Sequence, residues 1–314
     1  MTPPLVHIGY HKTGTQWIRH RFFGDSATGY RWLGKQPVDH PVKQLVRVRP
    51  LDFDAGAIRG AFEPLLAAAE AEGLLPVVSF PRLSGHPYSG GFDSKEIADR
   101  LKQVFPDARI LIIIREQASI ITSSYKQYVE AGGTCKPRQY LDPPKQEWRV
   151  PHFDLGHFEY DRLIRYYHSL YGPEAVLALP YEQFVRDGPA FIRSIGEFAG
   201  RPVPEEAIAR MPFSRWNPAK SALAIAASRP LNRFGPRTDL NPAPLVESMA
   251  VYRLAKRLRK ANLRKQRLTR TLAANSEERL RQVVRDVIGD RYRESNRATA
   301  ELIGVDLAEY GWKL

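Results

Sequence analysis

A lysine and two threonines stand in a turn near the start of the 314-residue chain. The segment reads LVHIGYHKTGTQW over residues 5–17, with an apolar run of strand length before the turn and a helical pattern over residues 15–23. A glycine-bearing turn between a buried strand and a helix directs free backbone N–H groups toward an anion. Lys12 adds a positive charge there, and Thr13 and Thr15 add hydroxyl donors. The segment therefore predicts a cradle for a phosphate or sulfate group.

This turn departs from the common nucleotide-binding loop. In that loop Lys-Ser/Thr follows the second glycine directly, whereas Lys12 precedes Gly14. The order leaves open an ordinary strand-to-helix turn with a stray lysine, or the variant phosphate loop of a nucleotide kinase. A kinase also needs carboxylates that hold magnesium at a strand end, and no expected strand here ends in an obvious aspartate.

A second possible anchor lies a hundred residues further along. Arg115 ends the most strand-like run, residues 109–114, and Ser123 follows within the helical pattern of residues 118–130. The planar guanidinium of arginine suits two parallel hydrogen bonds to a phosphate. The alternative is a salt bridge from Arg115 to Glu116 or to a neighbouring helix, with Ser123 as an ordinary helix residue without a binding role. Because parallel strands end at one edge of a sheet, both anchors are expected to serve one ligand there.

These two motifs resemble those of the sulfotransferases that use 3′-phosphoadenosine 5′-phosphosulfate (PAPS). HKTGT after a strand resembles their 5′-phosphosulfate loop, and ILIIIREQASIITSSYKQY carries an arginine and a serine at the family's spacing. Longer segments resemble bacterial carbohydrate-type sulfotransferases. These segments are PRLSGHPYSGGFDSKEIADRLKQVFPDARILIIIREQ, PYEQFVRDGPAFIRSIGEFAG and SNRATAELIGVDLAEYGW.

The resemblance implies a set of ligand-binding residues and a reaction. The residues that it implies for the 5′-phosphosulfate are His11, Lys12, Thr13, Gly14, Thr15 and Gln16. Arg115 and Ser123 would hold the 3′-phosphate, and Lys220 in WNPAKS would add a cation from a closing loop. The implied product is adenosine 3′,5′-bisphosphate, no metal is required, and the implied acceptor is a hydroxyl on a carbohydrate or glycolipid. A small-molecule alcohol or phenol is the alternative acceptor.

The catalytic base is where the chain departs from the family pattern. Similar proteins tend to read SNERLSG after the second strand, whereas residues 79–85 here read SFPRLSG, with Pro81 in place of the glutamate. Together with Lys12, His86 is the expected catalytic residue, because its unperturbed pKa near neutrality suits proton transfer. His11 and Asp93 are further candidates for the base. A local hydrogen bond from a loop histidine, and a weakened or altered activity, remain the alternatives.

The hydrophobic pattern predicts an α/β fold. Strand-length apolar runs cover residues 5–8, 74–80, 109–114 and 175–180, and helical patterns cover residues 54–72, 95–105, 118–130, 157–171, 182–200 and 276–303. This alternation predicts a P-loop-like parallel sheet flanked by helices on both faces. We expect a single domain over residues 1–314, with an α/β core at 1–212 and a mainly helical part at 213–314. Residues 24–54 are expected to be loops with one short element, and residues 136–151 a lid.

The composition limits the classes of binding partner and the cellular compartment that we expect for this protein. A formal net charge of +13 suits an anionic cofactor, an acidic glycan, an anionic membrane or nucleic acid. The dense basic stretch at residues 249–272 could contact an anionic membrane, although a solvated helix with one apolar stripe is the favoured interpretation. Basic residues are not interleaved with base-stacking aromatics, which argues against nucleic acid and against a non-catalytic binding protein. One cysteine, Cys135, and a beginning unlike a signal peptide predict a cytoplasmic protein.

Overall fold

The computed structural model describes residues 2–34, 41–143, 152–213, 220–260 and 267–314. Its centre is a five-stranded sheet in the order β2-β3-β1-β4-β5, in which all neighbouring strands are parallel. The strands are β1 Leu5–His7, β2 Tyr30–Trp32, β3 Leu75–Ser79, β4 Arg109–Ile114 and β5 Val176–Pro180. Val6 of β1 lies opposite Val78 on one side and Ile110 on the other. The expected parallel α/β sheet is confirmed.

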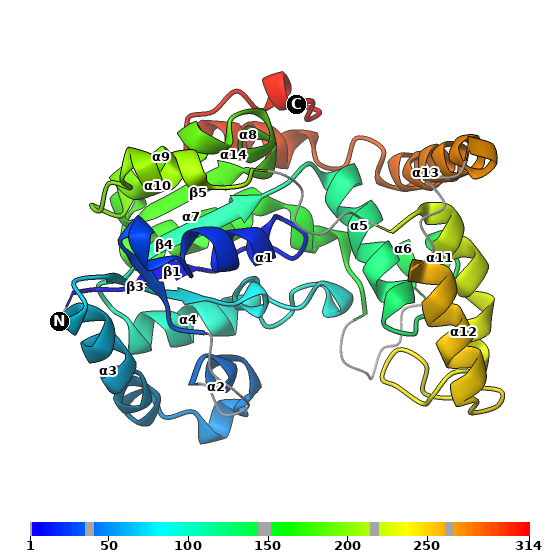
Figure 1. Ribbon diagram of the computed structural model, residues 1–314, viewed down its shortest axis with the longest axis horizontal. Coiled ribbons are helices and arrows are strands. Elements are labelled where there is room, and N and C mark those ends of the chain that lie inside the picture. The colour runs from blue at the N-terminus through cyan, green and yellow to red at the C-terminus, as the bar shows by residue number, and fades with distance from the viewer. Residues whose placement is uncertain (1, 35–40, 144–151, 214–219, 261–266) are drawn as a thin grey trace.

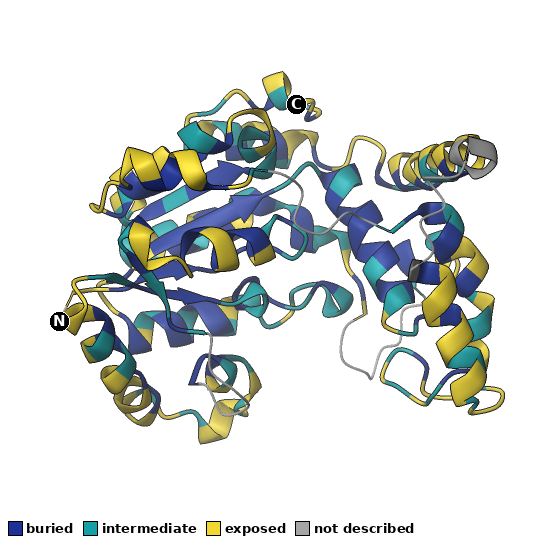
Figure 2. Cartoon of the chain, viewed as in Figure 1, coloured by how far each residue is buried: buried dark blue, intermediate teal, exposed yellow. Residues whose placement is uncertain are grey.

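Successive side chains of the strands enter two different hydrophobic clusters. Val6, Ile110 and Ile112 belong to one cluster, whereas Leu5 and Leu111 belong to the other. This division follows from the two-residue repeat of a strand, which places neighbouring side chains on opposite faces. Both faces are buried, as the dark strands in Figure 2 show, which explains why the strand sequences read as continuous apolar runs.

Helices cover both faces of the sheet (Figure 1). The first cluster includes buried residues of α3 Ala55–Ala71, α4 Ser94–Val104 and α7 Tyr160–Tyr171. The second includes residues of α9 Gly188–Phe198, α10 Glu205–Arg210 and the helix after β1. That helix begins as α1 Thr15–Trp17 and continues as a π-helical turn, Ile18–Phe22. The remaining helices of this part are α2 Pro41–Arg47, α5 Gln117–Glu130, α6 Pro137–Leu141 and α8 Tyr181–Arg186.

The C-terminal part is helical and packs beside α5. Its helices are α11 Ala222–Ser228, α12 Met249–Lys260, α13 Arg267–Ile288 and α14 Arg293–Ile303. A buried ion pair joins α13 to α5, with Lys126 Nζ 2.6 Å from Glu277 Oε2. Leu280 and Val284 of α13 enter the same cluster as the sheet residue Ile112. The helical part therefore shares its core with the α/β part.

Several local expectations differ from the observed elements. The region expected to be mostly loops contains the edge strand β2 and helix α2, because three strand residues are too few for a periodic pattern. The expected lid contains α6, and its residues 144–151 lie outside the described part of the chain. The single helix expected at residues 276–303 is broken where Gly289 takes the left-handed conformation, φ 50°. The basic stretch is divided between α12 and α13.

Candidate functional site

The turn after β1 has an unusual backbone. Gly14 has φ 77° and Lys12 has φ 69°. In the part of the chain that the structure describes, Lys12 is the only residue other than glycine with a positive φ. A non-glycine residue in this region costs of the order of 1 kcal/mol and persists only where its surroundings enforce it. One such contact is the hydroxyl of Thr13, which donates to the carbonyl of Tyr10 at 2.6 Å. The turn is thus held in a bent shape around Lys12.

Gly14 is required by a close contact as well as by its backbone angle. A Cβ atom at this position would lie 2.9 Å from Cε2 of Tyr181, the first residue of α8. The ring of Tyr181 therefore lies directly against the turn. This contact brings the carboxyl end of β5 to the carboxyl end of β1.

Arg115 connects the same turn to the end of β4. One guanidinium nitrogen donates to the carbonyl of Lys12 at 2.8 Å, and another donates to Oγ of Ser119 at 2.6 Å. The guanidinium also lies over the ring of Tyr181, 5.1 Å from its centroid. Three strand ends thus converge at one edge of the sheet. β1 lies between β3 and β4, so this is the crevice in which parallel α/β sheets bind ligands.

Helix α5 brings two serines to this edge. Ser119 and Ser123 are one turn apart and therefore share a helix face, and Ser119 receives the hydrogen bond from Arg115. Ser123 is buried, with 9% of its surface exposed. Ser119 was not among the residues selected from the sequence, although its position one turn before Ser123 was a usable signal.

Lys12 is surrounded by protein and by charges of both signs. Burial lowers the pKa of its ammonium, the positive charge of Arg115 lowers it further, and the carboxylate of Glu130 raises it. Nζ of Lys12 forms no hydrogen bond with any residue that the structure describes. The turn therefore presents a partly desolvated cation without a partner, which is a favourable arrangement for an anionic ligand.

The loop after β3, residues 81–94, faces the turn. Its His86 lies 6.0 Å from His11, measured between ring centroids. Burial lowers the pKa of His86 to about 4, aided by Arg82 and opposed by Asp93. The carboxylate of Asp93 accepts hydrogen bonds from Arg82 at 2.8 Å and from the backbone N–H of His86 at 3.1 Å. Asp93 therefore stabilises the loop.

The hydrogen bonds of His86 determine which nitrogen of its neutral ring carries the proton. Nδ1 accepts the backbone N–H of Tyr88 at 3.1 Å, so a neutral ring carries its proton on Nε2. In that tautomer Nε2 donates a hydrogen bond and does not accept a proton. His11 is also neutral near pH 7, because burial lowers its pKa to about 3.

The other residues selected from the sequence differ in how far they are buried. Thr15 is buried, with its hydroxyl 3.4 Å from that of Thr13, whereas Gln16 is exposed. Lys220 is half-buried and precedes α11. Among the described residues, Lys220 makes no hydrogen bond or ion pair with Lys12 or Arg115, and residues 214–219 of the expected closing loop lie outside the described part.

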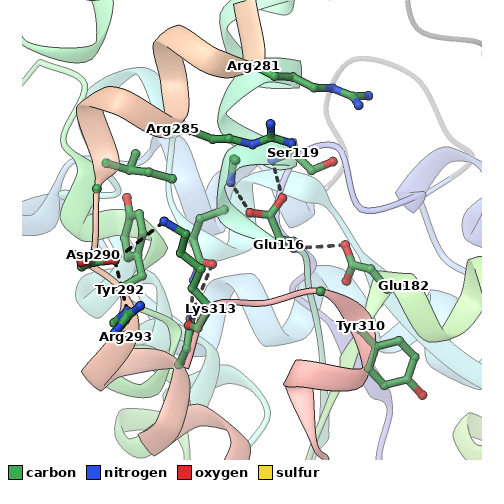
Figure 3. A pocket seen from close by; sticks show the side chains of 16 residues that line it. Glu116, Ser119, Glu182, Arg281, Arg285, Asp290, Tyr292, Arg293, Tyr310 and Lys313 are labelled. Carbon is green, nitrogen blue, oxygen red and sulfur yellow. Dashed lines mark hydrogen bonds and ion pairs between the residues drawn. The ribbon is translucent and has the colours of Figure 1, made fainter. Parts of the chain in front are cut away.

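A cavity of about 340 Å³ lies beside the start of α5 (Figure 3). Its wall includes Ser119 and Glu116, which accepts the backbone N–H groups of residues 118 and 119 at the helix start. The C-terminal part supplies the cations of the wall, which are Arg281, Arg285, Arg293 and Lys313. No local motif marks these cations, and they are separated from Arg115 by more than a hundred residues of sequence. Only the packing of the helical part against α5 places them here.

The described residues also bear on two other classes of site. No group of three or more histidine, cysteine, aspartate and glutamate side chains is placed to hold a metal ion within these residues. None of the helices in the described ranges has both the length and the apolar composition that a bilayer crossing requires.

Comparison with known proteins gives one family match. Residues 95–205 match the model of a sulfotransferase family. The match includes Arg115 and Ser123 and ends before the C-terminal helices, and Lys12 lies outside it. No curated protein sequence matches the chain.

Several solved structures resemble the protein. A sulfotransferase from Alicyclobacillus acidocaldarius is 16% identical, with 81% of this chain and 100% of that chain covered and a TM-score of 0.48. The sulfotransferase domain of the Synechococcus PCC 7002 olefin synthase is 14% identical, with coverages of 88% and 94% and a TM-score of 0.40. Mouse sulfotransferase SULT7A1 complexed with PAP is 14% identical, with coverages of 88% and 90% and a TM-score of 0.32.

Proposed function

We propose that this protein is a PAPS-dependent sulfotransferase that moves a sulfuryl group to an acceptor hydroxyl. The observation that carries the proposal is the hydrogen bond from Arg115 to the carbonyl of Lys12. It joins two cationic residues that follow different strands at one edge of the sheet. The sulfotransferase family match over residues 95–205 supports the same reaction.

The chain's own residues fit the nucleotide. Lys12 is half-buried and its ammonium has no hydrogen-bond partner among the described residues, and Nε of Arg115 is buried with no hydrogen-bond partner among them. Lys12, Thr13, Gly14, Thr15 and Gln16 would hold the 5′-phosphosulfate, with His11 beside them, and Lys220 remains a proposed further cation. Arg115 would hold the 3′-phosphate with Ser119 and Ser123 of the α5 face. When bound, PAPS supplies the activated sulfuryl group.

Lys12 has the main catalytic role in this proposal. Sulfuryl transfer, like phosphoryl transfer, depends on alignment and on stabilisation of developing charge. The ammonium of Lys12 would stabilise the charge that develops on the bridging oxygen of the departing phosphate. Because the ammonium is already partly desolvated, little reorganisation is needed as this charge forms. His86, whose Nδ1 is held by Tyr88, would contribute a hydrogen bond from Nε2 near the acceptor.

The proposed acceptor is a hydroxyl on a carbohydrate or glycolipid, with a small alcohol or phenol as the alternative. Contact with an anionic membrane would bring a glycolipid within reach. This part of the proposal is supported by α12, where Leu254 is 50% and Leu258 36% exposed beside the exposed cations Arg253 and Arg257. Vesicles containing phosphatidylglycerol should bind the wild type, and Leu254→Ser with Leu258→Ser should weaken that binding. Equal binding by the double variant would contradict membrane contact through α12.

Calorimetric titration with adenosine 3′,5′-bisphosphate and with ATP tests the nucleotide assignment. We expect the bisphosphate to bind more tightly than ATP, because it carries a 3′-phosphate for Arg115. Lys12→Ala should retain the fold, measured by circular dichroism, and lose sulfuryl transfer from PAPS by about 100-fold or more. Tighter binding of ATP, or unchanged turnover by Lys12→Ala, would overturn the proposal.

A further inference from the structure

Arg19 is a buried arginine outside the proposed nucleotide site. It lies in the π-helical turn that continues α1, four residues after Thr15, and only 7% of its surface is exposed. Its guanidinium makes no hydrogen bond and no ion pair with any residue that the structure describes. A buried charge is costly unless it is paired and hydrogen-bonded. An arginine that is buried without such a partner therefore indicates that a ligand supplies the missing anion.

The two ends of the Arg19 guanidinium differ in their access to solvent. Nε is buried without a hydrogen-bond partner, whereas the two terminal nitrogens, which also have no described partner, are not fully buried. The small exposed part of the side chain therefore includes these terminal nitrogens. They form the planar fork that binds a carboxylate or a similar oxyanion through two parallel hydrogen bonds.

The ring of Trp32 holds this guanidinium at the carboxyl end of β2. The guanidinium carbon of Arg19 lies 5.0 Å from the ring centroid of Trp32. Nε1 of Trp32 donates to the carbonyl of Ser79 at 3.3 Å, which fixes the ring between the last residues of β2 and β3. A contact with a ring face uses the charge of the cation and leaves its N–H donors for other partners. The contact with Trp32 therefore positions the guanidinium without satisfying its donors.

The same contacts place Arg19 beside the loop that follows β3. Ser79, which receives the hydrogen bond from Trp32, directly precedes this loop, and its Oγ is hydrogen-bonded to Nδ1 of His7 at 2.8 Å. His7 is the last residue of β1. Ser84 in the loop donates to the carbonyl of residue 9, in the turn after β1, at 3.4 Å. The carboxyl ends of β1, β2 and β3 are thus joined into one surface next to that turn.

The order of the strands places this surface on the acceptor side of the proposed site. β1 lies between β3 and β4, and the proposed nucleotide extends from Lys12 after β1 to Arg115 after β4. In the related phosphoryl transfer, the attacking and leaving oxygens are roughly in line on opposite sides of the transferred group. The acceptor therefore approaches Lys12 from the side of β3 and β2, where Arg19 and Trp32 lie.

We propose that Arg19 binds an anionic group of the acceptor, an inference that rests on the proposed function. The acceptor is then an acidic saccharide that carries a carboxylate or a sulfate ester near the hydroxyl that receives the sulfuryl group. The terminal nitrogens of Arg19 donate to this anion, and Trp32 keeps the guanidinium in place. Because a neutral sugar leaves the buried charge of Arg19 unpaired, this residue selects acidic over neutral acceptors.

Binding of matched sugars tests this assignment. Methyl β-D-glucuronide, methyl β-D-glucoside 6-sulfate and the neutral methyl β-D-glucoside are titrated into the protein saturated with adenosine 3′,5′-bisphosphate. We expect one of the anionic sugars to bind about tenfold more tightly than the neutral sugar, and the tighter of the two identifies the anion as carboxylate or sulfate ester. Arg19→Met should remove this preference, and Arg19→Lys should keep part of it. Arg210→Met, on the exposed surface of α10, is the matched control and should bind as the wild type does.

The stability of Arg19→Met separates ligand binding from a structural role. Because the charge is buried without a described partner, its removal should leave the thermal unfolding temperature unchanged or raise it. The affinity for the bisphosphate should also be unchanged. A lower unfolding temperature together with weaker binding of the bisphosphate would indicate a structural role and contradict the assignment.

The titrations also distinguish failure of this inference from failure of the proposed function. A wild-type protein that does not bind the bisphosphate removes the proposed function and the inference with it. A wild-type protein that binds the bisphosphate but neither anionic sugar more tightly than the neutral one removes only the inference, as does an unchanged preference in Arg19→Met. If Arg19→Met does not fold, Arg19→Gln takes its place, and an unchanged preference in that variant contradicts the role of Arg19 equally.

Discussion

Replacement of Arg115 by alanine gives the most direct test of the anion site. In the protein this guanidinium donates to the carbonyl of Lys12 and to Oγ of Ser119 and lies over the ring of Tyr181. Its Nε is buried and makes no hydrogen bond, so the side chain still has a donor for a ligand. Arg115→Ala therefore removes a positioning contact of the turn and a donor group for the 3′-phosphate at the same time.

The loss of the donor to the 3′-phosphate and the loss of the positioning contact should reduce ligand affinity by different amounts. A hydrogen bond to a charged group contributes about 1.5–3 kcal/mol, so loss of the bond from Nε to the 3′-phosphate should cost about 2 kcal/mol, or roughly 30-fold in affinity. The lost contact to the carbonyl of Lys12 is worth about 1 kcal/mol, which corresponds to roughly fivefold. AMP lacks the 3′-phosphate and should show only the smaller loss. Arg115→Lys should fall between these values, because it keeps the charge but not the planar fork.

Calorimetric titration of adenosine 3′,5′-bisphosphate and of AMP into both variants checks these numbers. Arg210→Ala is the matched control, because Arg210 is exposed on α10 and, within the described ranges, bonds only the carbonyl of Glu206 in its own helix. Equal losses for the bisphosphate and AMP would refute the assignment of Arg115 to the 3′-phosphate. Unchanged affinity for both ligands would also remove the argument that the ends of β1 and β4 hold one nucleotide.

Two further predictions concern the turn and the buried histidines. Gly14→Ala places a Cβ 2.9 Å from Tyr181 at a residue with φ 77°. Thermal unfolding should therefore show a loss of about 1–3 kcal/mol in the free energy of unfolding, and binding of the bisphosphate should weaken. Wild-type stability and affinity in this variant would argue against the tight turn. His157 is buried, and burial lowers its pKa from 6.5 to about 4, so the unfolded chain takes up a proton that the folded protein does not. Denaturant unfolding should therefore show a fall in the free energy of unfolding, contributed by His157, as the pH falls from 6.5 to 4. His157→Gln should reduce the slope of the free energy of unfolding against pH in this range. An identical slope in the variant would contradict the burial effect.

Local sequence was sufficient to predict the main strands of the sheet. The apolar runs that became β3, β4 and β5 were long enough to be identified, because a buried strand needs apolar residues on both faces. β2 was missed, because Tyr30–Trp32 is short and lies at the edge, where only Tyr30 is fully buried. The turn after β1 was likewise visible, because the small and polar residues that follow the strand at residues 9–14 form a local pattern.

The composition of the candidate site was only partly local. Lys12 could be selected because it lies in the turn after a strand, and Arg115 because it directly follows one, but the hydrogen bond between them spans 103 positions. Ser119 and Tyr181 gained their significance only from contacts across the crevice. A periodic pattern reports which face of an element is buried, and it carries no information on which distant side chain lies opposite.

The amino-acid sequence by itself therefore determined the class of fold and the two strand ends that carry Lys12 and Arg115, because both depend on residues that are neighbours in the chain. The tertiary structure decided that these ends meet and that cations of α13 line the cavity beside α5. The physical reason is that hydrophobic periodicity is set within single elements, whereas a site of this kind is assembled by the order of strands in the sheet and by helices packed from the other end of the chain.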